Sequence, residues 1–433
     1  MIVETQCLTF DPADAKSALT QLPQAAAVFA LYGEDPKAEP YIGRTPNLRG
    51  RLERLLQPSA KHPRRLQLAG RVRRIAYRLT GSEFESLLVQ FEMLQGVYGS
   101  KSLERMHLRA PAFIRYLGGN RYPRIVVTNR PSQREADWAY GPFASRAAAE
   151  RFAEEALKLF LLRRCVEELD PDPSHPGCVY SEMKMCLAPC YKGCTDERYA
   201  EESAAVESFL ATRGESRLVK LRTEREKASE NLEYEQAAAL HAQVQKVESV
   251  RALAPELVQP LSRLRAVVLQ PPAVGPTAPS ALAGELSVFL YEHGTLRGPA
   301  SFSTLGMRIQ NERSGSSSLF AQPVAVEAVP EIRDQRSEDR KQRTEARIAR
   351  DVLEARMEVV LAELAADHAP PSATERQGYL ALLKRWYYRP EVRRVGEIFF
   401  PDAEGRWPLK AMLRGVGRIA ARTMTGEQAA HPQ

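Results

Sequence analysis

The sequence predicts a multidomain α+β protein, and three observations support this class. The chain has 433 residues, whereas one domain usually has about 100–150, so we expect about three domains. Strand and helix patterns alternate near the N-terminus and return in the second half of the chain. Between these regions, cysteines gather in a short stretch, which is typical of a small segment held by a metal.

The N-terminal region begins with a predicted β-hairpin. Residues 25–32 form a short apolar run of strand character, residues 33–40 contain turn residues, and residues 41–43 begin a second strand. Residues 73–79 have the pattern of a third strand. We therefore expect a small antiparallel sheet in this part of the chain.

Two predicted helices flank these strands. Thr45 and Asn47 can cap a helix in which leucines recur at helical spacing, and Ser82 with Glu85 forms a capping pair for a second helix over residues 82–95. The first helix contains Leu48, Leu52, Leu55 and Leu56, with Arg49, Arg51 and Arg54 between them. The predicted order is β-hairpin, helix, strand, helix, with basic side chains along the first helix.

The cysteine group has the spacing C-x12-C-x7-C-x3-C and is followed by a fifth cysteine after three more residues. Such a group indicates disulfides outside the cell, or zinc or an iron–sulfur cluster inside it. Because the sequence shows no secretory signal and no stretch that could span a membrane, we expect a cytoplasmic protein and a metal. The five residues are Cys165, Cys178, Cys186, Cys190 and Cys194.

The spacing favours an iron–sulfur cluster of the 4Fe-4S type. Structural zinc usually takes two tight C-x2-C pairs, and the gaps here are long and uneven. Zinc, and buried thiols without a ligand, are the two alternatives. Cys7 lies far from the group and is expected to be a buried thiol.

The charge of the chain indicates an acidic partner. The net charge is +7, and arginines concentrate in residues 44–78 and 105–124. Nucleic acid is the natural acidic partner of such segments, so we expect binding to DNA. The alternative for each basic run is a solvated helix face.

Residues 41–52 (YIGRTPNLRGRL), in the order hairpin, helix, strand, helix, resemble the GIY-YIG nuclease domain at the N-terminus of the UvrC family, the incision subunits of bacterial nucleotide excision repair. Residues 121–126 (RYPRIV) and 140–143 (YGPF) resemble the segments that follow in that family. The resemblance ends near residue 250. It implies a GIY-YIG nuclease-like domain at 20–105, a linker and cysteine-cluster domain at 106–200 and a UVR helical hairpin at 215–252. The strand and helix patterns that follow predict a C-terminal α/β domain at 260–425.

The resemblance also implies roles for the cysteines. In the UvrC family, cysteines that match Cys165, Cys178, Cys186 and Cys190 hold an iron–sulfur cluster. Cys194 has no matching ligand role.

A partner surface is implied by residues 226–248. Their core, NLEYEQAA, resembles the UVR motif, a helical hairpin that binds UvrB. Two short amphipathic helices expose more apolar area than they can bury alone, which agrees with a partner surface. The same hairpin can instead pack against its own chain. The expected contacts with a UvrB-like protein are Leu232, Tyr234, Ala237, Ala238 and Val244.

The nuclease motif is incomplete. A GIY-YIG site uses one Mg²⁺ or Mn²⁺ held by a glutamate, a tyrosine that helps to activate water, and an arginine that steadies the phosphate. Tyr41 and Arg51 match the second tyrosine and the arginine, and Arg44 stands in place of a lysine. Phe29 replaces the first tyrosine and Gln90 replaces the glutamate. Because Mg²⁺ prefers anionic oxygen, we expect an impaired nuclease. The alternative is an active endonuclease that makes a single metal-dependent incision.

Neighbouring acids do not substitute for the missing glutamate in this prediction. Glu92 lies roughly 200° around the helix from Gln90, so it should face away. Glu83 shares the face of Gln90 but lies roughly 10 Å away along the axis. Phosphate contacts need positive charge only, so DNA binding can survive without the carboxylate. The DNA-binding residues expected from the motif are Arg44, Asn47, Arg49, Arg51 and Arg54.

The C-terminal region contains a second hairpin and a long helix. Residues 255–279 are rich in proline and alanine and suggest a strand at 264–269 with an exposed loop after it. Residues 285–291 and 296–302 have a hairpin pattern that weakly resembles the region leading into the RNase H-like domain of UvrC, although the family's Asp-Ile-Ser-His signature is absent. Residues 333–367 have the periodicity of one amphipathic helix.

Two shorter segments have two possible interpretations each, and the end of the chain is expected to be disordered. Residues 385–389 (RWYYR) have the mixture of a nucleic-acid surface or of a buried helix end. Residues 413–420 contain a G-x-G that suits a helix start, or less well the glycine hairpin of a helix–hairpin–helix element. Residues from 426 onward are expected to form a disordered tail.

Overall fold

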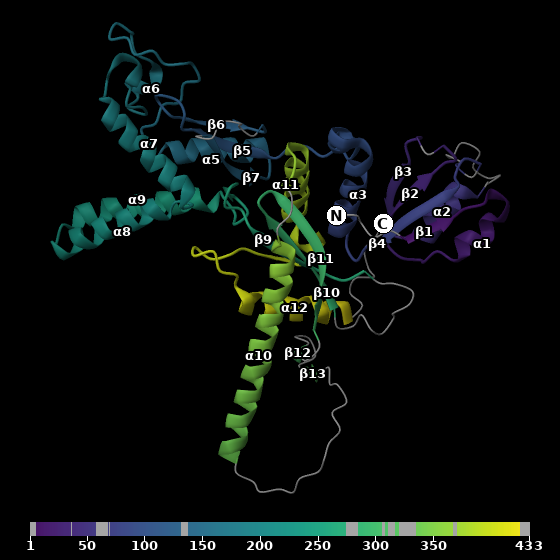
Figure 1. Cartoon of the computed structure of the whole chain (residues 1–433). Coiled ribbons are helices and arrows are strands. Elements are labelled where there is room, and N and C mark those ends of the chain that lie inside the picture. The colour runs from purple at the N-terminus through teal and green to yellow at the C-terminus, as the bar shows by residue number, and fades with distance from the viewer. Residues whose placement is uncertain are drawn as a thin grey trace. The chain divides into compact units, whose positions relative to one another are not determined.

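The computed structural model describes residues 6–35, 37–57, 68, 70–130, 137–273, 285–304, 308–310, 317–319, 335–366 and 370–424 (Figure 1). The chain forms two compact units. The first comprises Met1–Leu108, Arg265–Leu382 and Arg389–Gln433, and the second comprises Arg109–Leu264 and Leu383–Tyr388. The predicted α+β class is confirmed, since antiparallel sheets and helices make up the described residues.

The N-terminal part of the first unit contains a four-stranded sheet in the order β1-β4-β2-β3. The predicted hairpin is confirmed, with Ala27 opposite Thr45 and Leu31 opposite Tyr41. The strands are β1 (Gln6–Thr9), β2 (Ala27–Tyr32), β3 (Tyr41–Thr45) and β4 (Arg74–Leu79). The helices are α1 (Ala15–Thr20), α2 (Leu48–Leu56), α3 (Glu83–Tyr98) and the short α4 (Ser102–Arg105).

Local signals explain where α2 and α3 begin. The Asn47 side chain accepts a hydrogen bond from the backbone of Gly50, and the Ser82 hydroxyl accepts one from the backbone of Glu85. The leucines of α2 pack with the inward residues of β2 in one apolar core. Cys7 on β1 is exposed, so the expectation that it is a buried thiol is wrong. A position on a terminal strand at the edge of the sheet explains this exposure.

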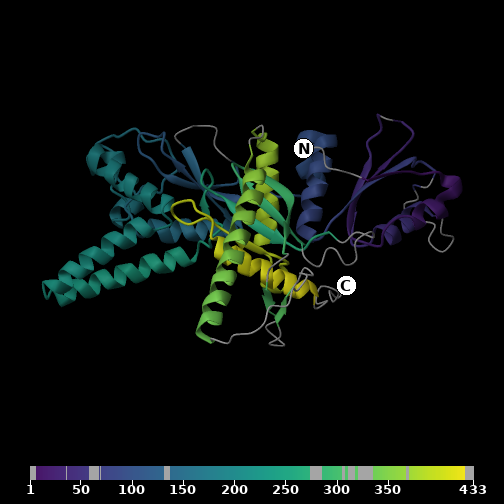
Figure 2. The ribbon, with the colours of Figure 1, turned by 60° about the horizontal axis from the view of Figure 1, so that its bottom comes forward.

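The second unit contains a sheet in the order β6-β5-β7-β8, with the cysteine segment and the helical hairpin in the same unit. Helices α8 and α9 run antiparallel and lie side by side in both views (Figures 1 and 2). The strands are β5 (Ala112–Leu117), β6 (Ile125–Thr128), β7 (Asp137–Phe143) and β8 (Gln259–Pro260). The helices are α5 (Arg146–Leu157), α6 (Val179–Glu182), α7 (Asp196–Ala211), α8 (Glu215–Glu230) and α9 (Tyr234–Ala252).

The C-terminal part of the first unit has a sheet in the order β11-β10-β9-β14, and α10 and α12 share its apolar core. The predicted strands and the predicted long helix are confirmed. The strands are β9 (Ala266–Gln270), β10 (Glu285–Glu292), β11 (Thr295–Ser303) and β14 (Glu397–Phe399), and β12 (Arg308–Gln310) pairs with β13 (Ser317–Leu319). The helices are α10 (Gln335–Ala365), α11 (Ala373–Tyr387) and α12 (Leu409–Met424).

Helix α12 begins at Leu409, before residues 413–420, so these residues are not a helix start. These residues lie inside one continuous helix, so the glycine-hairpin interpretation is wrong. The proposed loop at 274–279 and the tail from 426 lie outside the described residues. Within the described part of the chain, no helix combines the length and apolar character needed to cross a membrane.

Helix α3 also packs against the C-terminal part of the same unit. The ring of Phe84 meets that of Phe289 edge-on at 5.2 Å, and the ring of Phe91 meets that of Tyr379 at 5.3 Å. A Cβ on Gly378 would lie only 2.1 Å from Phe91 Cζ, so α11 approaches the ring at a point where a glycine is required. Segments far apart in sequence therefore share one packed interface.

This interface predicts an unusual effect of alanine at Gly378. A glycine-to-alanine change inside a helix normally stabilises by about 0.5–1 kcal/mol. At Gly378 the added methyl group meets a fully buried ring, so we expect a loss of about 1–3 kcal/mol instead. Gly417 in α12 is the matched control, because a Cβ there meets nothing within 4 Å and should stabilise. Urea unfolding of Gly378→Ala and Gly417→Ala measures both, and shifts of the same sign would contradict the contact.

Candidate nucleic-acid and metal-binding sites

The two aromatic positions of the nuclease-like motif come together on the hairpin. The rings of Phe29 and Tyr41 lie 6.1 Å apart between centroids. Gly43 lies beside both rings. A Cβ at this glycine would lie 2.9 Å from Phe29 Cζ and 3.4 Å from Tyr41 Cε1. Phe29 is fully buried and belongs to the core that α2 covers. Its ring therefore serves packing.

The acids near Gln90 are engaged elsewhere. Gln90 and Arg51 are partly buried, on α3 and α2. Burial raises the pKa of Glu92 to about 7, while the positive charge of Arg78 opposes this shift. Because the charge of Glu92 also helps to raise the pKa of Tyr379, this carboxyl lies beside α11. Glu92 is thus a partly buried acid at the interface between α3 and α11.

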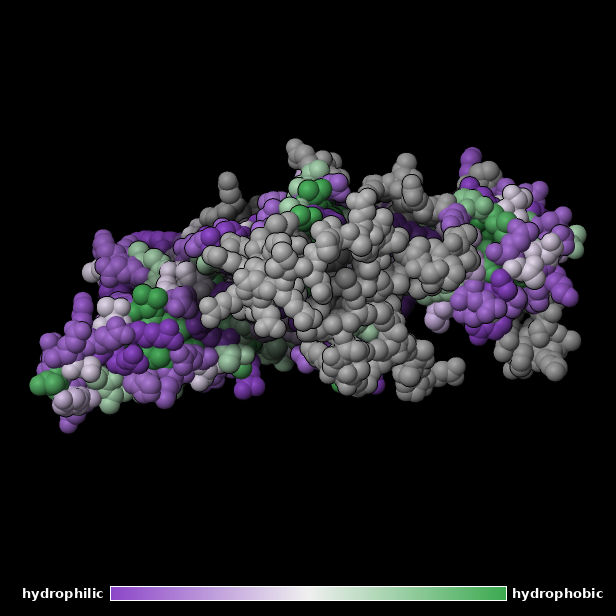
Figure 3. Space-filling model, turned by 90° about the horizontal axis from the view of Figure 1, so that it is seen from below, coloured by the Kyte–Doolittle hydropathy of each residue, from purple (hydrophilic) through white to green (hydrophobic). Residues whose placement is uncertain are grey.

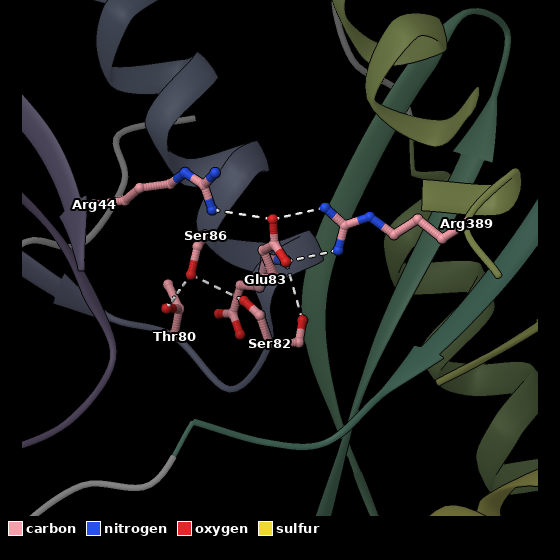
Figure 4. A network of polar contacts seen from close by, with 7 residues as sticks. Arg44, Thr80, Ser82, Glu83, Ser86 and Arg389 are labelled. Carbon is pink, nitrogen blue, oxygen red and sulfur yellow. Dashed lines mark hydrogen bonds and ion pairs between the residues drawn. The ribbon is translucent and has the colours of Figure 1, made fainter. Parts of the chain in front are cut away.

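Glu83 is held between two arginines (Figure 4). Arg44 on β3 donates to its carboxylate at 3.2 Å, and Arg389, just after α11, donates to both carboxylate oxygens at 2.6 and 2.7 Å. The hydrogen bond from Arg389 is the main reason why the pKa of Glu83 falls to about 2, against the opposing effect of burial. The carboxylate is therefore ionised at neutral pH.

The sequence interpretation missed this network. The signal in the sequence was the arginine at the end of residues 385–389. The sequence left open whether these residues form a nucleic-acid surface or a buried helix end. The structure buries Trp386 and directs the Tyr388 hydroxyl to the carbonyl of Pro142, so the aromatic side chains are engaged within the chain. The terminal Arg389 instead reaches Glu83.

The predicted DNA-binding residues divide into two groups. Arg49 donates to the carbonyl of Leu22 at 2.6 Å, and the Asn47 side chain is the cap of α2, so both have structural roles. Arg54 is exposed and donates to the carbonyl of Gly50 one turn earlier, which leaves its outer nitrogens toward solvent. Arg44 on β3 and Arg51 and Arg54 on α2 remain as basic groups of this part of the chain.

The four predicted cysteine ligands lie near one another. The neighbouring thiols of Cys165, Cys178 and Cys190 add to burial in raising the pKa of Cys186 to about 11. None of these four forms a disulfide. Among the described residues, however, no three His, Cys, Asp or Glu side chains are grouped closely enough to hold a metal ion as they stand. The four thiols are therefore near one another, but they do not surround a common point at which a metal ion could bind.

Backbone and side-chain donors surround these sulfurs. The backbone of Ala188 donates to Cys186 Sγ at 3.3 Å, and Arg163 Nη1 lies 3.7 Å from Cys165 Sγ. Arg163 is buried and also donates to the carbonyls of Tyr122 and Glu167. Hydrogen bonds to sulfur are one means by which a protein tunes a thiolate-bound cluster. The sequence interpretation did not identify Arg163, whose only signal was a basic residue two positions before a cysteine.

Cys194 differs from the four. It packs against the apolar core of the second unit, and burial followed by the charge of Asp196 raises its pKa.

The helical hairpin buries its apolar faces and exposes its turn. Leu240, Val244, Val247 and Val250 of α9 share a core with Leu218, Leu221 and Ala228 of α8. At the turn, Leu232 is 67% exposed and Tyr234 is 68% exposed. The left end of Figure 3 shows the hairpin as a largely hydrophilic surface with separate hydrophobic areas.

One predicted partner contact needs correction. Val244 is only 3% exposed, because α8 covers it, so it cannot contact another protein while the hairpin is folded. Ala237 is partly buried against the same core, and Ala238 is exposed. The available apolar surface is therefore centred on Leu232 and Tyr234.

Comparisons with known proteins match these parts of the chain. A family model described as UvrC/Cho excinuclease, middle domain, matches residues 113–209, and a model described as UvrB/uvrC motif matches residues 215–250. No solved structure matches.

Similar proteins include UvrABC system protein C from several bacteria. The protein of Alcanivorax borkumensis is 28% identical over 211 residues, which are 49% of this chain and 34% of that protein. The protein of Ruminiclostridium cellulolyticum is 28% identical over 243 residues, 55% of this chain and 39% of that protein. The protein of Carboxydothermus hydrogenoformans is 27% identical over 232 residues, 53% of this chain and 38% of that protein. The matches thus span well under half of each relative.

The two family-model matches coincide with the second unit, whose sheet, cysteine segment and helical hairpin they cover in turn. Together with the similar proteins, they show that residues 113–250 of this chain are similar to the middle domain and the UvrB/uvrC motif of UvrC-type proteins.

Proposed function

We propose that the chain is a DNA-binding protein of bacterial nucleotide excision repair that acts in the cytoplasm, with an impaired GIY-YIG site. One observation carries this proposal: the residues matched by the two UvrC-type models form one compact unit in which the turn of the hairpin is exposed. A UvrC-like chain that has lost its own incision chemistry can still bring DNA and a partner together.

The impairment rests on two side chains. Phe29 is a fully buried ring without a hydroxyl, and Gln90 supplies a neutral amide where a divalent metal needs a carboxylate. Glu83 is occupied by two arginines, and Glu92 lies beside Tyr379. None of these acids stands ready to replace the missing ligand.

DNA binding would use basic side chains of the N-terminal hairpin and of α2. Arg44, Arg51 and Arg54 supply charge there, and phosphate contacts need charge without a carboxylate. The net charge of +7 supports the same partner.

Cys165, Cys178, Cys186 and Cys190 would hold an iron–sulfur cluster, for which four neighbouring thiols and their N–H···S donors are suitable. When bound, the cluster would crosslink the cysteine segment and supply a one-electron redox centre. Zinc is the alternative for the same four thiols. The residues of the chain hold the thiols near one another, and closure around a metal would release their protons.

The hairpin would bind a UvrB-like protein through its turn. An exposed tyrosine is a typical anchor for a partner, and an apolar side chain beside it can add contact area. Leu232 and Tyr234 fit this role, with Ala238 beside them on α9.

The proposal predicts a loss of binding when the turn becomes polar. We expect Leu232→Asp with Tyr234→Ala to weaken binding of the full chain to UvrB by about 30-fold or more, because two exposed anchors are removed. Val219 on α8 is exposed on the same hairpin, so Val219→Asp is the matched control and should have little effect. Titration calorimetry measures the three affinities. Equal affinities of the double variant and the control would refute the turn as the partner surface.

A further inference from the structure

Two guanidinium groups from distant parts of the chain meet at one carboxylate. Arg44 belongs to the N-terminal hairpin and Arg389 to the segment after α11, and both contact Glu83 at the start of α3 (Figure 4). The side chains remain accessible: Arg44 is 36% exposed, Glu83 44% and Arg389 24%. An ion in solvent can therefore reach all three.

Contacts that do not involve the Glu83 carboxylate hold the surrounding elements in place. The turn before α3 is tied by hydrogen bonds from the backbone of Gly81 to Glu85 and between the hydroxyls of Thr80 and Ser86. The ring pairs of Phe84 with Phe289 and of Phe91 with Tyr379 join α3 to the C-terminal part of the same unit. The elements that carry the two arginines should therefore stay together when the carboxylate leaves.

We propose that Arg44 and Arg389 form a binding site for one phosphate of a nucleic-acid backbone, and that the carboxylate of Glu83 fills this site in the free protein. We call the pair the double-arginine clamp. A guanidinium group binds carboxylate and phosphate oxygens with the same two-pronged geometry. A phosphodiester carries one negative charge, as Glu83 does, so the exchange leaves the charge at the clamp unchanged.

The clamp gives Glu83 a regulatory role. In the free protein the carboxylate competes with anions for both arginines, which lowers the affinity of the clamp for a phosphate. A bound strand therefore contacts the clamp fully only when the carboxylate is displaced or removed. The clamp rests on the proposed DNA binding and adds Arg389, which the N-terminal motif does not contain.

The test compares Glu83→Gln with the unmodified full chain. We expect the variant to bind a fluorescent DNA duplex about five- to tenfold more tightly, because the competing charge is gone. The slope of log Kd against log salt concentration should increase by about 1, the value of one additional phosphate contact. Glu39→Gln is the matched control, since it removes one negative charge and an ion pair with Arg105 elsewhere in the same unit. Its effect should stay below about twofold.

A second substitution assigns the effect to the clamp. Arg389→Ala in the Glu83→Gln background should return the salt slope to that of the unmodified chain, whereas Arg389→Lys should retain part of the gain because it keeps the charge. Thermal unfolding establishes that each variant is folded, and Arg389→Lys serves if the alanine variant is not. Equal tightening by Glu83→Gln and Glu39→Gln would overturn the clamp and leave DNA binding intact. Failure of every variant and of the unmodified chain to bind DNA would reject the proposed function, and the clamp with it.

Discussion

Restoring glutamate at Gln90 and tyrosine at Phe29 should give the chain metal-dependent nicking activity on lesion-bearing duplex DNA. We expect a rate at least about 10²-fold above that of the unmodified chain, since a positioned proton-transfer group alone contributes about 10²–10⁴-fold. The glutamate supplies the anionic oxygen that Mg²⁺ or Mn²⁺ prefers, and the hydroxyl supplies the proton-transfer atom. A nicking assay with UvrA, UvrB and either metal measures the rate.

The burial of Phe29 predicts that the tyrosine substitution costs more stability than the glutamate substitution. Because its ring is fully enclosed and touches the position of Gly43, a new hydroxyl must find a partner in a packed core. Gln90→Glu alone should therefore fold more stably than the double variant and recover part of the activity. Gln57→Glu, at the end of α2, makes the same chemical change away from the motif and should recover none.

Two outcomes would contradict this account. Robust incision by the unmodified chain would support the active endonuclease that the sequence left as the alternative. A folded double variant that binds metal and does not cut would place the defect at a group other than these two side chains.

Removal of the Cys186 thiol should abolish the metal centre. This thiol is near the three other predicted ligands, as their effect on its pKa indicates, so Cys186→Ser leaves only three sulfurs around the site. The protein purified without oxygen should lose its iron and its broad visible absorption. The segment should also unfold more easily, because the binding free energy of a metal contributes to the folding free energy of the residues that hold it. Iron analysis, an absorption spectrum and thermal unfolding measure these effects.

Cys7→Ser and Cys194→Ser are the controls for the metal centre. Cys7 lies on β1 in the other unit, and Cys194 packs against an apolar core, so both variants should keep the iron. Iron retained by Cys186→Ser would remove this residue from the ligand set. A colourless unmodified chain with one zinc would decide for the alternative metal.

Local sequence signals account for most elements of the fold. The β2–β3 hairpin, the caps Asn47 and Ser82, and the β10–β11 hairpin follow from residues close together in the chain, and each appears as predicted. The pairing of β1 with β4 and of β14 with β9 was not predicted. Such short strands carry little pattern of their own and form because a distant partner satisfies their backbone groups.

The sequence also could not show which apolar side chains are buried within the chain. Val244 has the apolar spacing of a partner contact, and the same spacing equally suits the face that α8 covers. Periodicity identifies an apolar face and leaves open what covers it. The glycines at 415 and 417 likewise permit a turn, and α12 runs through them because its apolar side packs on the sheet.

By itself, the sequence determined the α+β class, the cysteine group, the helical hairpin and the replacement of two side chains in the nuclease-like motif. Only the tertiary structure joined Arg44, Glu83 and Arg389, of which Arg389 lies 306 positions beyond Glu83 along the chain. Motifs depend on residue types at short spacing, which a sequence displays directly. A contact between distant charges depends on how α3 packs against the C-terminal part of its unit, and that packing arises from many apolar side chains together.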